Sequence, residues 1–259
     1  MPRPLIADLA AGLTGENPSP PFFILGAARS GTTLLRVLLD SHPHLSVGPE
    51  TNVLHHWFDA VENAQTLRFY PYPPDDLLRY PAAAFELMHI RYMRDRGKRR
   101  WGDKTPNYVT VLDDILKCWP EAQVIHCIRD GRDVVCSMRE RWGWSVRAGS
   151  RRWRDRVEKV LTQAANLSAR QYLEVRYEQL VSEPRYELSR ILRFLEEPWD
   201  ESVLDHSQSA HNGVEDDVAE AGGDITTESV GRWRQQMSPL DRYVFGRQAA
   251  SLLRRLGYR

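Results

Sequence analysis

The stretch FFILGAARSGTTLLRVLL, residues 22–39, decides the fold of this chain. Its first four residues are apolar without alternation, which is typical of a strand buried on both faces of a sheet. A glycine-containing turn follows at residues 26–31, and residues 33–39 carry apolar side chains at helical spacing. The stretch therefore predicts a strand, a tight turn and a helix, the unit from which parallel α/β sheets are built.

The turn between this strand and this helix has the composition of an anion site. It places Arg29 and several backbone N–H groups at a helix N-terminus, where phosphate binds well. The glycine spacing equals that of the nucleotide-binding P-loop, but Thr32 stands where the P-loop lysine belongs. The turn predicts a P-loop-like phosphate cradle and argues against ATP or GTP hydrolysis. An incidental tight turn is the alternative.

Further strands and helices follow the same alternation. Residues 123–128 form a second predicted strand, which leads through Arg129 to Asp133 into a helix from Val134 to about Trp142. Shorter strands are expected at residues 45–47 and 172–175, and a helix at residues 184–195. We therefore predict a three-layer α/β/α fold with a central parallel sheet of about four or five strands.

Three local features complete the predicted outline. Thr51 is expected to cap a helix that runs through Phe58. The proline-rich stretch from Pro71 to Pro81 is expected to be a loop that leads into a helix through Met88 and Tyr92 and serves acceptor access. The polar stretch from His206 to Gly223 is expected to be a mobile loop.

Composition limits the classes of function. The chain of 259 residues suits one domain, expected at residues 21–259 after a flexible lead-in at residues 1–20. The charges of its 35 basic and 35 acidic residues cancel, so no net positive electrostatic field favours a nucleic-acid partner. No run of about 18 apolar residues is present, so no membrane span is predicted. Three unpaired cysteines, read as packing residues, favour a cytoplasmic setting.

The phosphate cradle resembles the 5′-phosphosulfate loop of sulfotransferases that use 3′-phosphoadenosine-5′-phosphosulfate (PAPS), and in particular the branch that includes tyrosylprotein sulfotransferases. A second motif supports the resemblance. Arg129, at the end of a strand, and Ser137, eight residues later, stand where that family binds the 3′-phosphate. A guanidinium suits this task because it contacts phosphate in a bidentate manner. The cradle residues that the resemblance assigns to PAPS are Arg29, Ser30, Gly31, Thr32 and Thr33.

The resemblance extends to two further nucleotide ligands. Tyr177, in the segment VRYEQLV at residues 175–181, matches a tyrosine that contacts the nucleotide. Arg232, beside Trp233, matches a basic-aromatic pair that holds the 3′-phosphoadenosine. The simpler interpretation of Tyr177 is an aromatic residue that closes the start of a helix.

The resemblance also implies the catalytic residues. Glu50, after the second predicted strand, matches the glutamate that acts as general base. Lys104, expected in a loop before a helix that starts at Pro106, matches the lysine that supports the sulfuryl group and the leaving oxygen. Arg29 is expected to neutralise the departing 5′-phosphate, so no metal is required. Each of these residues also has a purely structural alternative. Glu50 could be a carboxylate at a helix N-terminus that complements the helix dipole, and Lys104 could be a surface lysine. Arg129 could form a surface ion pair with Asp130.

Other features leave the acceptor open. Tyrosylprotein sulfotransferases also use a serine upstream of the basic-aromatic pair. Asp217 stands near its place here, and the nearby hydroxyls of Thr226 and Ser229 do not match it by position, so this role is left unassigned. Adjacent His55 and His56 should point apart on a helix, which argues against a shared metal, although one of them could line the acceptor site. The segment from Arg139 to Arg156, with seven arginines and three tryptophans, either receives an acidic or aromatic acceptor or forms a solvated helix face.

The predicted function is therefore sulfuryl transfer from PAPS to a hydroxyl or amine of an acceptor, which could be a small molecule, a glycan or a peptide tyrosine. Two rival functions remain. A P-loop kinase or nucleotide phosphotransferase is disfavoured by the missing lysine and by the lack of a recognisable magnesium-binding strand. A non-catalytic nucleotide-binding protein is disfavoured by the presence of both Glu50 and Lys104. Oligomeric state cannot be deduced from these residues.

Overall fold

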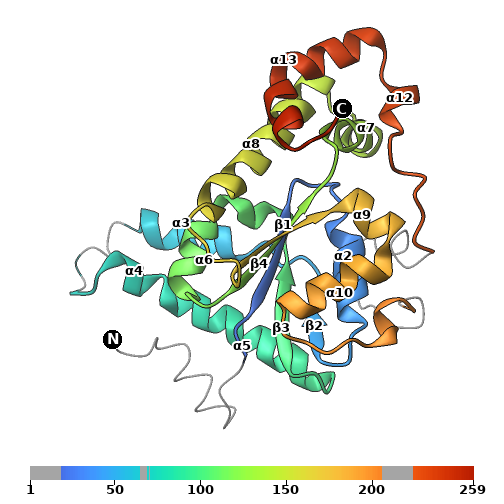
Figure 1. Cartoon of the computed structure of the whole chain (residues 1–259). Coiled ribbons are helices and arrows are strands. Elements are labelled where there is room, and N and C mark those ends of the chain that lie inside the picture. Colours follow the sequence, from blue (N-terminus) through green and yellow to red (C-terminus); the bar gives the residue numbers. More distant parts are fainter. Residues whose placement is uncertain (1–18, 65–68, 70, 206–223) are drawn as a thin grey trace.

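A five-stranded parallel sheet forms the centre of the molecule (Figure 1). The computed structural model describes residues 19–64, 69, 71–205 and 224–259. Within them the strand order is β2-β3-β1-β4-β5, and every neighbouring pair is parallel. The predicted α/β fold with a central parallel sheet is thereby confirmed. The strands are β1 (Phe22–Gly26), β2 (Leu45–Val47), β3 (Arg100–Lys104), β4 (Gln123–Ile128) and β5 (Tyr172–Arg176).

Helices cover both faces of the sheet, as the alternation of side chains along β1 requires. Phe22 and Ile24 pack into a core cluster with α2, α9 and α10, whereas Phe23 and Leu25 pack into a second cluster with α3, α5 and α6. The helices are α2 (Thr32–Asp40), α3 (Leu54–Asn63), α4 (Pro74–Leu77), α5 (Arg79–Asp95), α6 (Leu112–Cys118), α7 (Gly131–Trp142), α8 (Val146–Ala164), α9 (Tyr177–Ser182), α10 (Pro184–Phe194), α12 (Trp233–Gln236) and α13 (Pro239–Arg255), with 3-10 turns η2 (Pro106–Thr110) and η3 (Glu201–Val203).

A third core cluster lies beyond the carboxyl end of the sheet, where α7, α8 and α13 pack together (Figure 1). Trp153 of α8 is fully buried there against Phe245 of α13, with ring centroids 5.9 Å apart. These helices stand over the edge of the sheet at which the predicted site residues emerge. Within the described residues, no helix is long and apolar enough to cross a membrane.

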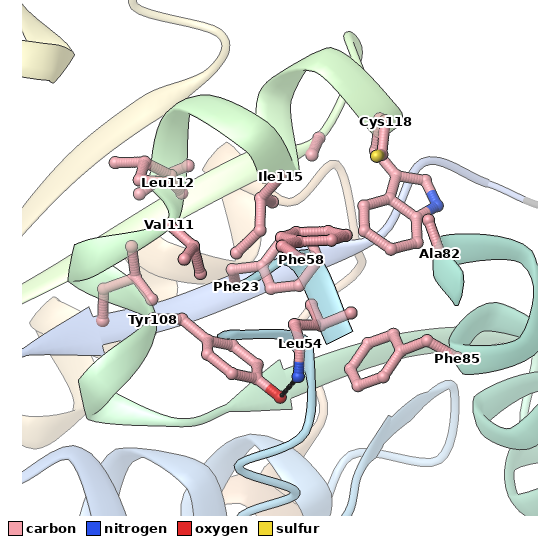
Figure 2. Packing of buried hydrophobic residues seen from close by; sticks show 14 of the residues in the cluster. Phe23, Leu54, Phe58, Ala82, Phe85, Tyr108, Val111, Leu112, Ile115 and Cys118 are labelled. Carbon is pink, nitrogen blue, oxygen red and sulfur yellow. Dashed lines mark hydrogen bonds between the residues drawn. The ribbon is translucent and has the colours of Figure 1, made fainter. Parts of the chain in front are cut away.

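The cluster between the sheet and α3, α5 and α6 includes the polar hydroxyl of Tyr108. Figure 2 shows the ring of Tyr108 among apolar neighbours that include Leu54 and Phe85, with its hydroxyl facing the start of α3. The Tyr108 hydroxyl accepts the backbone N–H of Leu54 at 3.1 Å. Because the first N–H groups of a helix have no partner within the helix, this contact anchors α3 to η2.

Three local predictions were wrong in detail. Pro71 to Pro81 is no continuous loop, since it contains α4 and the start of α5. Thr51 does not cap α3, whose N-cap is Val53, because the Thr51 hydroxyl binds other partners. Helix α7 begins at Gly131 rather than Val134. Its earlier start has a physical cause, because the Asp130 side chain caps it by accepting the backbone N–H of Arg132 at 2.9 Å.

Strand β3 was missed by the sequence analysis, and Lys104 was wrongly expected in a loop. The segment RWGDK contains Trp101 as its only large apolar residue, so no apolar pattern marks it as a strand. It nevertheless lies between β2 and β1, with all five residues buried. Lys104 is therefore the last residue of an interior strand, and the predicted helical start at Pro106 is confirmed as a 3-10 turn.

The three cysteines are buried and unpaired, as their interpretation as packing residues requires. Burial raises the pKa of the thiols of Cys127 and Cys136 above the usual range. The predicted lead-in at residues 1–20 lies almost wholly outside the described residues, and so does the predicted loop from His206 to Gly223.

Gly102 tests the packing that admits β3 into the sheet. A Cβ atom at Gly102 would lie 2.4 Å from the ring of Phe22 on the neighbouring strand. Gly102→Ala must displace that fully buried ring, so we expect a loss of about 1–3 kcal/mol in the free energy of unfolding, measured by chemical denaturation. Gly246→Ala, in α13 with open space around the added methyl group, is the matched control and is expected to stabilise by up to about 1 kcal/mol. Equal stability of both variants and the wild type would contradict this account.

Candidate active site

The phosphate cradle has the backbone conformation of an anion-binding loop. Arg29 and Gly31 have φ values of 70° and 87°, in the left-handed region, and Gly31 is the N-cap of α2. A Cβ atom at Gly31 would meet the ring of Tyr177 at 2.2 Å, so only glycine fits there. The loop thereby directs the first N–H groups of α2 toward the carboxyl edge of the sheet.

The two predicted phosphate motifs lie in direct contact. The Nε atom of Arg29 donates to Ser137 Oγ at 3.0 Å, although the two residues are 108 positions apart in the chain. Arg129 in turn donates to the backbone oxygen of Arg29 at 3.1 Å. Strands β1 and β4 are neighbours, and both motifs follow their carboxyl ends. The sheet topology therefore brings the cradle and the second motif into one site.

Arg129 is held in place by buried contacts. Its side chain is 5% exposed, its Nη2 atom donates to the backbone oxygen of Ser229 at 2.5 Å, and its guanidinium lies 4.4 Å from the centre of the Tyr177 ring. Burial is the main cause that lowers the pKa of Arg129. The alternative of a surface ion pair with Asp130 is wrong, because both side chains are buried and Asp130 pairs with Arg132 at 2.7 Å.

Tyr177 stands at the start of a helix, as the simpler interpretation expects, and its contact with the nucleotide stays a prediction. It is the first residue of α9, and its ring also packs against Gly31 and the Arg129 guanidinium. The next residue, Glu178, was not singled out from the sequence. Its carboxylate accepts the backbone N–H of Asp130 at 2.8 Å and thus joins α9 to the start of α7.

Asp133 anchors the predicted basic-aromatic pair, a role that the sequence analysis missed. Its carboxylate accepts the N–H groups of Gly231 at 2.7 Å and Trp233 at 2.8 Å, while burial raises its pKa. The intervening Arg232 pairs with Glu140 of α7 at 3.0 Å. The only sequence signal for this role of Asp133 was its position in the helical turn after Arg129, and carboxylates are too common at such positions to indicate a role.

Lys104 joins the predicted base to the cradle. Its Nζ atom donates to Glu50 Oε1 at 2.6 Å and to Thr33 Oγ1 at 3.3 Å. The Lys104 side chain is fully buried, which rules out the alternative of a surface lysine, whereas the Glu50 side chain is 31% exposed. A carboxylate that can be reached from outside therefore stands next to a buried cation, and that cation also borders the phosphate loop.

Several buried polar atoms around the site have no hydrogen-bond partner among the described residues. They include Ser30 Oγ, Arg129 Nε and Arg232 Nε. Buried polar groups in proteins normally have partners, so these atoms fit a polar anionic ligand. The donor set of hydroxyl, guanidinium and helix N–H groups is the chemistry that binds phosphate and sulfate. The predicted nucleotide ligands thus form one connected set that suits PAPS, and their individual roles stay predictions.

Histidine and arginine side chains occupy the two segments that the sequence analysis associated with the acceptor. His55 and His56 do not point apart as predicted, because their rings pack with centroids 3.9 Å apart. Burial lowers the pKa of His55, with smaller contributions from His56 and from Arg156 of α8. The segment from Arg139 to Arg156 is only partly a solvated face, since its Trp153 is fully buried. A surface cavity of about 550 Å³, here named the α8 cavity, is lined by Trp144, Ala148, Arg151, Arg152, Asp155 and Arg156.

One group of potential metal ligands lies elsewhere in the described part of the chain. His42, His44 and Glu197 have ligand atoms within 4.8 Å of one another. However, His42 Nδ1 accepts the backbone N–H of His44 at 3.1 Å, and its Nε2 lies 2.9 Å from the backbone oxygen of Pro198. Both ring nitrogens of His42 therefore already have partners, so this cluster carries no metal assignment.

Comparisons with known proteins agree with this geometry. The chain is 32% identical to protein-tyrosine sulfotransferase 1 of Danio rerio over 99% of its own length and 80% of that protein. It is 29% identical to the protein-tyrosine sulfotransferase of Drosophila melanogaster, over 92% of this chain and 52% of that protein.

Solved structures show the same fold. The sulfotransferase domain of the olefin synthase from Synechococcus is 25% identical, with a TM-score of 0.64 over 91% of this chain and 96% of that one. A mouse sulfotransferase solved in complex with PAP is 15% identical, with a TM-score of 0.56 over 91% of this chain and 85% of that one. Residues 20–201 match the family described as the sulfotransferase family. The chain therefore belongs to the sulfotransferase family.

Proposed function

We propose that this chain transfers a sulfuryl group from PAPS to a hydroxyl or amine of an acceptor, with Glu50 as general base. The observation that carries the proposal is the position of the Lys104 ammonium between Glu50 Oε1, at 2.6 Å, and Thr33 Oγ1, at 3.3 Å. Group transfer needs a base for the acceptor proton and a cation at the leaving oxygen, both next to the reacting atoms. The contacts of Lys104 supply both at one place.

The donor side of the proposal rests on the two phosphate motifs. PAPS, when bound, supplies an activated sulfuryl group and a 5′-phosphate leaving group. The cradle at residues 29–33 would hold the 5′-phosphosulfate through the N–H groups of α2, with Arg29 close by. Arg129 and Ser137 would hold the 3′-phosphate, with Tyr177 and Arg232 beside the nucleotide. The unpartnered Nε atoms of Arg129 and Arg232 support this assignment.

The reaction follows from the chemistry of these side chains. The Glu50 carboxylate takes the proton of the acceptor hydroxyl while the hydroxyl oxygen of the acceptor forms a bond to sulfur. At the same time the bond between sulfur and the oxygen of the 5′-phosphate breaks. The Lys104 ammonium and Arg29 guanidinium stabilise the negative charge that grows on the departing oxygen. Because Lys104 is fully buried, its charge acts with little screening by water.

The 3′-phosphate motif can be tested by calorimetric titration with 3′-phosphoadenosine-5′-phosphate (PAP), AMP and magnesium-ATP. We expect PAP to bind at least about 100-fold more tightly than AMP, a difference of about 2.7 kcal/mol. Arg129→Ala should remove most of this preference because the bidentate guanidinium is lost. Arg185→Ala, which breaks an exposed ion pair with Glu201, is the control and should keep it. Tighter binding of magnesium-ATP than of PAP would favour the kinase alternative.

The base assignment can be tested with Glu50→Gln. The amide keeps the size of the side chain but cannot take the proton, so kcat at saturating acceptor should fall by about 10²- to 10⁴-fold. PAP affinity should stay nearly unchanged, which calorimetry can measure in the same preparation. Glu62→Gln, at an exposed position of α3, is the matched control. Full turnover by Glu50→Gln would contradict the assignment. If neither the wild type nor any variant turns over PAPS, a non-catalytic binding protein would be favoured.

For the acceptor we propose an anionic molecule with a phenolic or alcoholic hydroxyl. The α8 cavity supports this class, because Arg151, Arg152 and Arg156 line it and Arg152 lies 5.5 Å from the Trp144 ring centre. These three arginines make no ion pair among the described residues, so their charges are available to an anion. Helix α8 packs against η2, and η2 packs against α3, which starts four residues after Glu50. Relatives named protein-tyrosine sulfotransferase make a peptide tyrosine the first acceptor to test.

A pair of tyrosine peptides tests the acceptor class. A peptide with aspartates around the tyrosine should give a higher kcat/KM than its neutral counterpart, and the difference should shrink in salt because exposed charges are screened. Arg152→Gln should lower the preference by about threefold to tenfold through KM, the size expected for one charged contact. Arg255→Gln, an exposed arginine at the end of α13, serves as control. Equal use of both peptides by the wild type would contradict the proposal.

A further inference from the structure

Both chain neighbours of Lys104 bind the residue that follows Glu50. The hydroxyl of Thr51 donates to Asp103 Oδ2 at 3.0 Å. The backbone N–H of Thr51 donates to Thr105 Oγ1 at 3.2 Å. Glu50 and Lys104 are therefore joined twice, once by their own ion pair and once through Thr51. The roles described above make no use of this second connection.

With the Asp103 carboxylate as acceptor, the hydrogen bonds from Tyr108 through Thr51 run in one direction. The Tyr108 oxygen accepts two N–H groups at the start of α3, from Val53 at 3.0 Å and from Leu54 at 3.1 Å, the second of which is drawn in Figure 2. Its own proton is then directed to Thr51 Oγ1 at 2.7 Å, and Thr51 donates its single hydroxyl proton to Asp103. Burial and the charge of Asp103 raise the pKa of Tyr108 well above its usual value, so Tyr108 remains a donor. The hydrogen bonds therefore run from the start of α3 through Tyr108 and Thr51 to the carboxylate of Asp103.

Burial of the Asp103 carboxylate at this position lowers the stability of the fold. Its side chain is 1% exposed, and Oδ1 has no hydrogen-bond partner among the described residues. On its other side, His89 Nε2 lies 3.4 Å from Oδ2, while His89 Nδ1 lies 2.9 Å from the Phe85 carbonyl oxygen. An isolated buried carboxylate destabilises a fold. A charged acceptor, however, makes a stronger bond to the Thr51 hydroxyl than a neutral one does.

The geometry of β3 separates this contact from the reaction itself. Successive side chains of a strand point to opposite faces, so Asp103 lies on the face of the sheet covered by α5 and Lys104 on the other. Trp101, which shares a face with Asp103, packs in the cluster with α5, and Gly102, which shares one with Lys104, contacts Phe22 in the other cluster. Asp103 can thus fix the Glu50 segment without competing with Glu50 for the ammonium.

We propose that Asp103 and Thr51 form a positioning pair that sets the Glu50 carboxylate against the Lys104 ammonium. This inference rests on the proposed function, in which Glu50 is the base. Glu50 belongs to neither a helix nor a strand, and its side chain is partly exposed. Two hydrogen bonds at the next residue restrict the backbone from which it extends, so the base is oriented before an acceptor arrives.

The first test needs no activity. Crystal structures of the unliganded wild type and of Thr51→Val, which keeps the shape of the side chain but lacks the hydroxyl, should differ at the ion pair. We expect the Glu50 Oε1 to Lys104 Nζ contact, 2.6 Å in the wild type, to be lost or divided between positions in Thr51→Val and restored in Thr51→Ser. Thr110→Val, which removes a hydroxyl bound to the Asn107 oxygen in η2, is the matched control and should keep the contact.

The second test is kinetic. Thr51→Val should lower kcat by about tenfold or more while the acceptor KM and PAP affinity change by less than about threefold, and Thr51→Ser should recover most of the loss. Asp103→Asn, which keeps the shape but loses the charge, should lower kcat in the same direction and provides a second variant if one fails to fold. Retention of both full kcat and the 2.6 Å contact in Thr51→Val would overturn the positioning pair. A wild type that transfers no sulfuryl group would instead contradict the proposed function. The comparison of crystal structures would then still test whether Thr51 and Asp103 hold Glu50 against Lys104.

Discussion

The buried ammonium of Lys104 is the interaction on which the rest of the site depends. A charge taken fully out of water costs several kcal/mol unless an opposite charge and hydrogen bonds compensate it. Here the compensation comes from Glu50 at 2.6 Å and from Thr33 at 3.3 Å. Those two residues belong to the segment after β2 and to the first turn of α2, so one cation ties the predicted acceptor side to the phosphate cradle. Strand β3 has to lie between β2 and β1 for this contact to form.

The parallel sheet explains why distant motifs meet. Carboxyl ends of parallel strands share one edge, and ligands of such folds bind there. The cradle follows β1, Arg129 follows β4, Lys104 ends β3 and Tyr177 follows β5. Contacts such as Arg29 to Ser137 at 3.0 Å then link elements that are far apart in the sequence. The helices α7, α8 and α13 add a layer beyond this edge, and α8 also packs against η2.

Local sequence was sufficient for strands that are mostly apolar and lead directly into a turn and a helix. Strands β1 and β4 are examples, because such a run followed by a glycine-containing turn indicates its own structure. Strand β3 was not predictable, since its charged residues are buried through partners far away in the chain. Arg100, for instance, donates to the carbonyl oxygen of Leu195 and to the side chain of Gln123. For the same reason the contacts of Asp133, Asp103 and Thr51 could not be predicted, because their partners lie far away in the chain.

A crystal structure of the chain with bound PAP tests the central claim most directly, because it locates both phosphates relative to Lys104. The account predicts the 5′-phosphate at the N–H groups of residues 30–33, with an oxygen at hydrogen-bond distance, about 3 Å, from Lys104 Nζ. It also predicts the 3′-phosphate on Arg129 and Ser137. A nucleotide bound away from the cradle, or a 5′-phosphate that leaves Lys104 out of reach, would contradict it.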